Sequence, residues 1–232
     1  MITKEQIKAF AREFKTNEST VFREYLQILF LNRLYKHEGS GQVFFKGGTA
    51  IHLLLGAPRF SEDLDFTVMM TEKEFSLLLN TVINELAKEE ELAFKERKTI
   101  AGKRFLLTAK PGVLPYATFI NLDFSFREKV WQPAKSILDT SYPIVFTSFI
   151  HHLSAEEMCA EKIRALLTRQ KGRDFFDLWF LLSKGVLINN QLVKEKLHYY
   201  KITDDKLTDL WQKIQQFPEK EYIIDLRPFV PV

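Results

Sequence analysis

The blocks Phe45-Lys46-Gly47-Gly48-Thr49-Ala50 and Ser61-Glu62-Asp63-Leu64-Asp65-Phe66-Thr67-Val68 decide the fold. In the first, a short apolar segment, Val43–Lys46, passes through two glycines into a helical pattern. Glycine lets the backbone approach a ligand closely, and a helix N-terminus presents free N–H groups to a phosphate. A Gly-Gly turn can equally be a matter of chain geometry. It is not a Walker A loop, because Lys46 precedes the glycines.

The second block has the alternation of a half-buried strand. Asp63 and Asp65 point to one face, about 6–7 Å apart along the strand, and Leu64 and Phe66 point to the other. Two carboxylates at this spacing can hold a hard divalent cation through oxygen ligands. The alternative is a solvated sheet edge, since an Asp-x-Asp pair is common by chance.

A third carboxylate, Asp123, lies on the polar face of the apolar strand pattern 118–126. If this strand lies beside that of Asp63 and Asp65, three carboxylates meet at one point. Like charges repel at such distances unless cations compensate them. Two Mg²⁺ ions bound there with a triphosphate would balance the charge and stabilise an in-line displacement.

The rest of the chain surrounds this centre with helices and strands. The patterns predict helices over 3–36, with a capping point near Asn17, and over Thr71–Glu91, and strands over 104–109 and 118–126. The segment 129–148 resembles a loop, and the pattern is helical from Ser154 to about Phe217. We therefore expect an α/β (α+β) domain with a mixed sheet and flanking helices at 1–145, and a helical C-terminal domain at 146–232.

Composition excludes several classes of protein. The 232 residues include 33 Lys and Arg against 30 Asp and Glu, so the net charge of +3 does not suit a uniformly basic protein. The single cysteine, Cys159, allows no internal disulfide and no Cys-rich zinc site. No apolar run approaches the roughly 18 residues of a membrane span, and the start, MITKEQIKAF, is polar. We expect a soluble cytoplasmic protein without a membrane partner.

Several blocks in combination resemble the AbiEii toxin family of the polymerase-β-like nucleotidyltransferases. The resemblance extends from about Val43 to Leu182. It rests on these segments: Phe45–Ala50, Arg59–Phe66, Glu156–Leu167, Arg169 and Arg173–Leu178. It implies a nucleotidyltransferase fold, with a later helix that contributes a lysine and an acidic residue to the site of the first domain.

The resemblance also implies the role of each matched residue. Asp63, Asp65, Lys162 and Asp174 are expected to be catalytic, Lys162 by contacting the triphosphate. The expected metal ligands are Asp63, Asp65 and Asp123, of which Asp123 is the weakest match. The residues expected to bind the nucleotide are Lys46, Gly47, Gly48, Thr49, Ser61 and Lys162.

A plainer interpretation exists for the later block. Five basic and no acidic residues lie between Lys162 and Arg173, which also fits a solvated basic face. Arg173 and Asp177, four residues apart, could form a helix-surface pair worth only about 0.2–0.5 kcal/mol. Asp174 could simply lie at the start of a helix.

A basic stretch from Lys95 to Lys110 holds six basic residues and one acidic residue. Beside a nucleotide site it could bind an RNA backbone, and a charged hairpin in water explains it equally well. The candidate RNA-binding residues are Lys98, Lys103, Arg104, Arg169 and Arg173.

The resemblance implies a Mg²⁺-dependent enzyme, with Mn²⁺ as a substitute. It would move a nucleotidyl group from an NTP to an acceptor hydroxyl and release pyrophosphate. It would be the toxin of a toxin–antitoxin or abortive-infection pair, with a cognate antitoxin and the tRNA 3′ end as its target. The alternatives are a small-molecule nucleotidyltransferase of the aminoglycoside type and a non-catalytic nucleotide-binding regulator. The sequence leaves the oligomeric state open.

Overall fold

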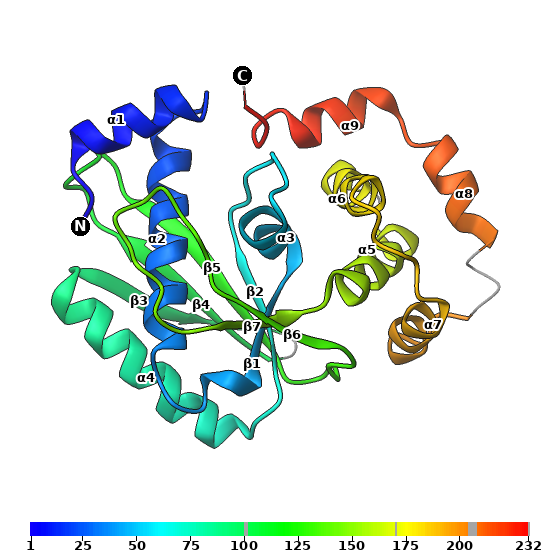
Figure 1. Ribbon diagram of the computed structural model, residues 1–232, viewed down its shortest axis with the longest axis horizontal. Helices are drawn as coiled ribbons and strands as arrows, with labels where there is room; N and C mark the ends of the chain where they lie inside the picture. The colour runs from blue at the N-terminus through cyan, green and yellow to red at the C-terminus, as the bar shows by residue number, and fades with distance from the viewer. Residues whose placement is uncertain (100–101, 170, 204–207, 232) are drawn as a thin grey trace.

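The computed structural model describes residues 1–99, 102–169, 171–203 and 208–231. Its strands form one mixed seven-stranded sheet in the order β3-β4-β5-β2-β1-β7-β6 (Figure 1). They are β1 (Val43–Lys46), β2 (Leu64–Val68), β3 (Leu92–Arg97), β4 (Lys103–Ala109), β5 (Thr118–Ser125), β6 (Pro133–Ser136) and β7 (Ile150–Leu153). The predicted α/β class with a mixed sheet is confirmed.

The helices divide into a group around the sheet and a group after it. The first group is α1 (Lys4–Glu13), α2 (Glu18–Tyr35), the short 3₁₀ turn η1 (Ser40–Gln42), α3 (Gly47–Leu55) and α4 (Glu72–Glu89). The second is α5 (Ala155–Thr168), α6 (Gly172–Ser183), α7 (Asn190–Tyr199), α8 (Thr208–Gln215) and α9 (Glu219–Leu226). Figure 1 shows α3 between the sheet and the second group, where it packs against α5 and α6.

Local capping fixes the helix starts that the sequence predicts. Thr3 and Gln6 form a capping box at the start of α1, and the Asn17 side chain accepts a hydrogen bond from the Thr20 N–H at the start of α2. A second capping box, Thr71 with Glu74, starts α4. Each cap satisfies backbone N–H groups that the first helical turn leaves unpaired.

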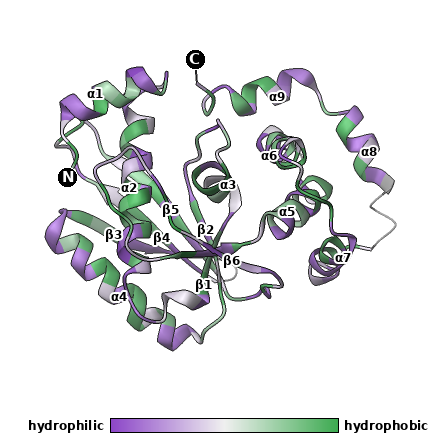
Figure 2. Ribbon diagram, in the orientation of Figure 1, coloured by the Kyte–Doolittle hydropathy of each residue, from purple (hydrophilic) through white to green (hydrophobic). Residues whose placement is uncertain are grey.

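The core lies between the sheet and the helices α2 and α4. Phe66 of β2 stacks on Phe124 of β5 with ring centroids 4.9 Å apart, and Phe75 of α4 packs on Phe124 at 4.7 Å. Phe30 of α2 contacts Phe66 from the same side. α4 carries both hydrophobic and hydrophilic residues along its length, as one buried face requires (Figure 2). These aromatic contacts account for several of the 21 phenylalanines in the chain.

Strand register brings the predicted carboxylates together. β2 pairs in parallel with β5, and Asp65 lies directly opposite Asp123. β2 also pairs antiparallel with β1, which places Lys46 opposite Asp65. On the outer side of β5, β4 runs antiparallel and places Arg104 opposite Asp123. The condition set by the sequence, that the strand of Asp123 lies beside that of Asp65, is therefore met.

Two short strands occupy a region whose structure the sequence did not predict. β6 lies inside 129–148, which the sequence predicted as a loop, and β7 follows residue 145 and pairs in parallel with β1. The segment looked like a loop because Pro133 occupies the first position of β6, and proline is tolerated there since β6 is an edge strand. The division into two domains stays a prediction. The pairing of β7 leads us to propose it at Ser154 instead of 145/146.

The C-terminal segment returns to the first half of the chain. α9 lies beside α6, and the segment after α9 reaches the loop between α3 and β2 (Figure 1). The Phe60 N–H donates to the Phe229 carbonyl at 2.7 Å, and the Gly172 N–H donates to Asp225 Oδ2 at 2.8 Å. The tail therefore fastens both the loop that leads to Asp63 and the start of α6. No helix in the described part of the chain is long and apolar enough to cross a membrane.

Candidate active site

A polar cavity of about 410 Å³ lies where the ends of β2 and β5 meet α3, α5 and α6. Its charged lining has five acidic residues, namely Asp63, Asp65, Asp123, Glu128 and Asp174. Its basic residues are Lys46, Arg59, Arg104, Arg127, Lys162, Arg169, Lys171 and Arg173. Residues from both halves of the chain thus share one site.

The two glycines of the turn are required by the protein's own side chains. Gly47 has a φ of +80°, a conformation that residues with a Cβ rarely adopt, and a Cβ there would lie 2.5 Å from Asp65 Oδ2. A Cβ on Gly48 would collide with the Arg59 guanidinium and lie 3.3 Å from Ser61 Oγ. The Lys46 side chain does not cap α3, so the first N–H groups of this helix remain available beside Asp65.

We expect Gly47→Ala to be more damaging than Gly56→Ala. Gly56 has nearly the same φ, +79°, but no atom lies within 4 Å of the position that a Cβ would take, so it reports the backbone cost alone, about 1–2 kcal/mol. Gly47→Ala adds the collision with Asp65. Thermal unfolding of both variants measures the difference, and activity should fall in Gly47→Ala only. Equal losses of stability and activity would show that the Asp65 contact is unimportant.

The three carboxylates have different neighbours. The Asn121 side-chain amide donates to Asp63 Oδ1 at 2.9 Å, and Arg104 Nε donates to Asp123 Oδ1 at 2.5 Å. Asp65 has no such partner among the described residues. Burial and the charges of Asp123 and Asp63 raise the pKa of Asp65 to about 6, while Lys46 and Lys162 oppose this. Burial and the two neighbouring carboxylates therefore disfavour the ionised form of Asp65.

This donor set suits a hard divalent cation. Carboxylate oxygens are the ligands that Mg²⁺ prefers, and a cation would offset the repulsion that raises the pKa of Asp65. Among the described residues, no three acidic, His or Cys side chains are yet arranged closely enough to hold an ion. Asp63 and Asp65, with Asp123 beside them, are the residues that would hold it.

Three of the residues predicted to bind nucleotide have other partners. The Thr49 hydroxyl is buried and donates to the Asp63 carbonyl, so it positions the backbone just before β2. Lys46 Nζ lies 2.5 Å from Glu128 and 3.1 Å from Glu161. Ser61 lies in the cavity wall, and its carbonyl accepts a hydrogen bond from Gln27 at 3.0 Å. Gly48 also lines the cavity, as its predicted role requires.

Lys162 belongs to a chain of alternating charges that connects the two halves. Its ammonium lies 2.9 Å from Asp174 and 2.7 Å from Asp177. Arg59, from the loop before Asp63, donates to both oxygens of Asp177 at 2.6 Å, and Arg169 closes the other end on Asp174 at 2.8 Å. These cations hold the pKa values of Asp174 and Asp177 below their usual range.

Arg59 and Asp177 are functional candidates to which the sequence assigned no role. Both are almost completely buried. Asp177 does not pair with Arg173, the surface partner considered from sequence, because Arg173 lies over the Phe229 ring at 4.7 Å. A signal was present, since Asp174 and Asp177 are three residues apart and share one helix face.

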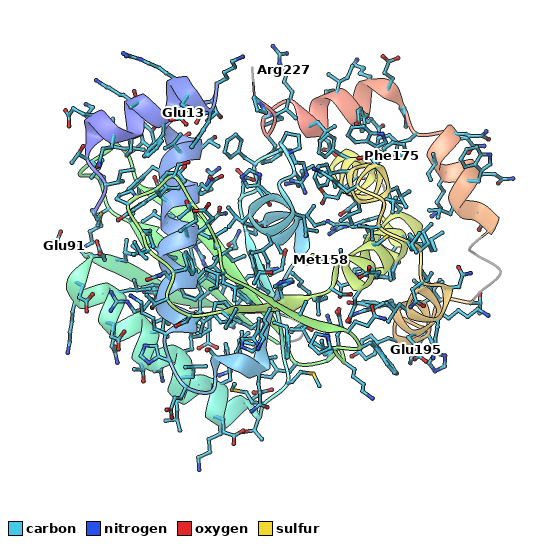
Figure 3. All side chains as sticks on the ribbon, in the orientation of Figure 1. Glu13, Glu91, Met158, Phe175, Glu195 and Arg227 are labelled. Carbon is cyan, nitrogen blue, oxygen red and sulfur yellow. The ribbon has the colours of Figure 1, made fainter. Side chains whose placement is uncertain are left out.

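Lys46 belongs to a second buried network of ion pairs. Lys196 of α7 lies 2.7 Å from Glu157 and 3.0 Å from Glu161, which also binds Lys46. The Tyr200 hydroxyl donates to Glu128, the other partner of Lys46. α5, which carries Glu157 and Glu161, packs against both α3 and α7, and Figure 3 shows its Met158 close to the sheet. Strand β1 is thus tied to the helical half.

The sequence matches the profile of one protein family over most of its length. The family described as "Nucleotidyl transferase AbiEii toxin, Type IV TA system" matches residues 29–227. The chain belongs to the AbiEii family. It is a nucleotidyltransferase of a toxin–antitoxin type, which implies an NTP substrate and a cognate antitoxin, and enzymes of this kind use a divalent metal. No curated protein matches the chain in sequence.

Solved structures share this AbiEii architecture. The nucleotidyltransferase toxin MenT4 of Mycobacterium tuberculosis is similar with a TM-score of 0.65 at 21% identity, over 89% of this chain and 73% of that one. JHP933 of Helicobacter pylori gives 0.57 at 20% identity, over 88% and 94%. A nucleotidyltransferase of H. pylori gives 0.52 at 20%, over 90% and 98%. At these identities the likeness shows the fold.

The AbiEii site includes only some of the residues predicted to bind RNA. Arg104, Arg169 and Arg173 line the cavity. Lys103 points to the other face of the sheet, where it donates to the Ser76 hydroxyl of α4 at 2.9 Å. Lys98 is exposed and lies outside the cavity lining. β3 and β4 form an edge hairpin, which fits the alternative of a charged hairpin in water.

Proposed function

We propose that this protein is a Mg²⁺-dependent toxin that transfers a nucleotidyl group from an NTP to the 3′ end of a tRNA and releases pyrophosphate. The observation that carries the proposal is the register of β2 and β5. It places Asp65 beside Asp123, while Gly47 at the start of α3 lies so close to Asp65 that an added Cβ would be 2.5 Å from Asp65 Oδ2. Carboxylates and a free helix N-terminus are thus adjacent. This is what a metal-bound triphosphate requires.

Each element has a role in this reaction. Asp63 and Asp65, with Asp123, would hold the divalent cation, either Mg²⁺ or Mn²⁺, and would help to activate the acceptor hydroxyl. When bound, the cation stabilises negative charge on the attacking and leaving oxygens. The N–H groups of Gly47 and Gly48 bind the phosphates, and Lys162, oriented by Asp174, adds positive charge. The acceptor oxygen bonds to the α-phosphorus as the bond to the pyrophosphate oxygen breaks.

The lining of the cavity favours a polyanionic acceptor over a cationic small molecule. Eight basic residues outnumber five acidic ones, whereas an aminoglycoside, which is polycationic, would require an acidic site. A tRNA and its NTP meet in the cytoplasm, where we place the activity.

The test is incubation of the protein with each labelled NTP, Mg²⁺ and total tRNA. We expect one or more NTPs to label the RNA and to yield pyrophosphate. Asp63→Ala should abolish the labelling, because it removes a proposed metal ligand. Glu62→Ala is the matched control, since the Glu62 side chain is 44% exposed, pairs with Arg23 at 3.0 Å and lies outside the cavity lining. Absence of labelling with every NTP, or full activity of Asp63→Ala, would refute the proposal.

A further inference from the structure

The basic residues of the cavity divide into three sets by burial and by partner, and Arg104 and Arg169 are the ones that are more exposed and ion-paired. Lys46, Arg59 and Lys162 are at most 8% exposed, and each is ion-paired. Arg127 and Lys171 are exposed, and Arg173 is partly buried. Arg127, Lys171 and Arg173 form what we call the rim set. Within the described parts of the chain, no carboxylate lies within ion-pair distance of any rim residue. None of the described carboxylates therefore neutralises their positive charge through an ion pair.

The rim set comes from both walls of the cavity. Arg127 follows β5 immediately, on the wall that carries Asp123. Lys171 and Arg173 lie at the start of α6, on the wall that carries Asp174. The aromatic ring of Phe229 supports the Arg173 guanidinium from the C-terminal tail. A ligand that contacted all three residues would span the mouth.

The size of the cavity limits what can enter it. A volume of about 410 Å³ is near the lower end of the range of roughly 300–1,000 Å³ for small-molecule sites. It suits a nucleotide-sized ligand, so the remainder of an RNA acceptor must lie across the mouth. RNA carries a phosphate at every step, and unpaired Lys and Arg side chains bind phosphates with release of counterions.

We propose that Arg127, Lys171 and Arg173 bind the phosphodiester backbone of the RNA acceptor. The inference rests on the proposed function, because it takes RNA as the acceptor. It assigns backbone binding to residues on the two walls of the cavity instead of to the stretch Lys95–Lys110. Arg104 and Arg169 are less suited, since Asp123 and Asp174 already offset their charge.

The test is the salt dependence of RNA binding without NTP. The probe is a fluorescein-labelled tRNA transcript. Its anisotropy gives the association constant K at KCl concentrations between about 50 and 200 mM, where phosphate contacts change the affinity strongly. Each of Arg127→Ala, Lys171→Ala and Arg173→Ala should reduce the slope of log K against log[salt] by about 0.7–0.9, the value of one lost phosphate contact. Lys98→Ala, an exposed control outside the cavity lining, should leave it unchanged.

Three further measurements separate a lost backbone contact from a loss of folding and from a loss of nucleotide binding. Arg127→Lys should restore the slope, and thermal unfolding shows whether Arg173→Ala still folds. Calorimetry should give the same NTP affinity for all variants. Unchanged slopes for Arg127→Ala and Lys171→Ala would overturn the inference. Variants that lose affinity for NTP instead of RNA-backbone contacts would overturn it too. Because binding is measured without transfer, a lack of RNA labelling would refute the proposed function and leave this result standing.

Discussion

Replacing Asp65 by asparagine is expected to lower the rate of nucleotidyl transfer by at least about 10³-fold, because charge stabilisation by a bound cation is worth several kcal/mol and each 1.36 kcal/mol is tenfold in rate. Asparagine keeps the size of the side chain and removes the charge that the cation requires. The same change should make the metal-free protein more stable, because burial and the charges of Asp123 and Asp63 disfavour the ionised form of Asp65. Activity and stability should thus change in opposite directions.

The raised pKa of Asp65 also predicts how the stability of the metal-free protein changes with pH. The pKa of Asp65 is raised from 3.8 to about 6 in the folded protein, so folding favours its protonated form. Metal-free wild type should therefore lose stability as the pH rises from about 4 to about 6, and Asp65→Asn should lack this part of the loss. Thermal unfolding in EDTA across this range measures both proteins.

Glu62→Gln is the control for Asp65→Asn. It also removes one negative charge, but from an exposed side chain outside the cavity, so both activity and the pH profile should stay as in wild type. An Asp65→Asn protein that transfers nucleotide at the wild-type rate would show that Asp65 is not a catalytic ligand. If its stability fell instead of rising, the repulsion argument would be wrong.

Asp177→Ala should destabilise the protein by about 3–5 kcal/mol, since removal of one partner leaves a buried charge uncompensated. Asp177 is fully buried, accepts two hydrogen bonds from Arg59 and forms an ion pair with Lys162. Alanine would leave Arg59, itself 2% exposed, without its carboxylate. At roughly 2–4 °C per kcal/mol for a chain of this size, the melting temperature should fall by roughly 6–20 °C.

Two comparisons make this result specific. Glu89→Ala breaks a more exposed pair, Arg33–Glu89, and should cost less than about 1 kcal/mol. The double variant Arg59→Met with Asp177→Leu replaces the buried pair by apolar side chains and should be more stable than Asp177→Ala alone. A loss in Asp177→Ala no larger than that in Glu89→Ala would show that the charge chain does not hold the two halves together.

The local features of this structure could be predicted from the sequence. The caps at Thr3, Asn17 and Thr71 and the alternation around Asp65 each depend on a few neighbouring residues, so their elements were correctly predicted. The identity of the site residues came from a family pattern, and their roles stay predictions. For Asp123 the sequence predicted a role only if its strand lay beside that of Asp65. Local patterns do not decide this, because strand pairing is a long-range property.

The parts that could not be predicted depend on register and on distant partners. The face to which Lys103 points is decided by one residue of strand register, which a charge-rich stretch does not reveal. Arg59 and Asp177 are 118 positions apart, and no local pattern connects them. The sequence shows how many cations lie between Lys162 and Arg173, but not that Lys162 is ion-paired with two aspartates while Arg173 lies over an aromatic ring.

The charge chain from Arg59 to Asp174 also bears on how the toxin is made. The carboxylate strand and the helix that completes the site are made at different times. About 110 residues separate Asp65 from Asp174, which at roughly 5–20 residues per second take a ribosome roughly 5–20 s to add. Until α6 emerges, Arg59 and Lys162 have no Asp177 to bind. A nascent chain that ends before α6 therefore lacks the ion pairs that join the two halves of the cavity.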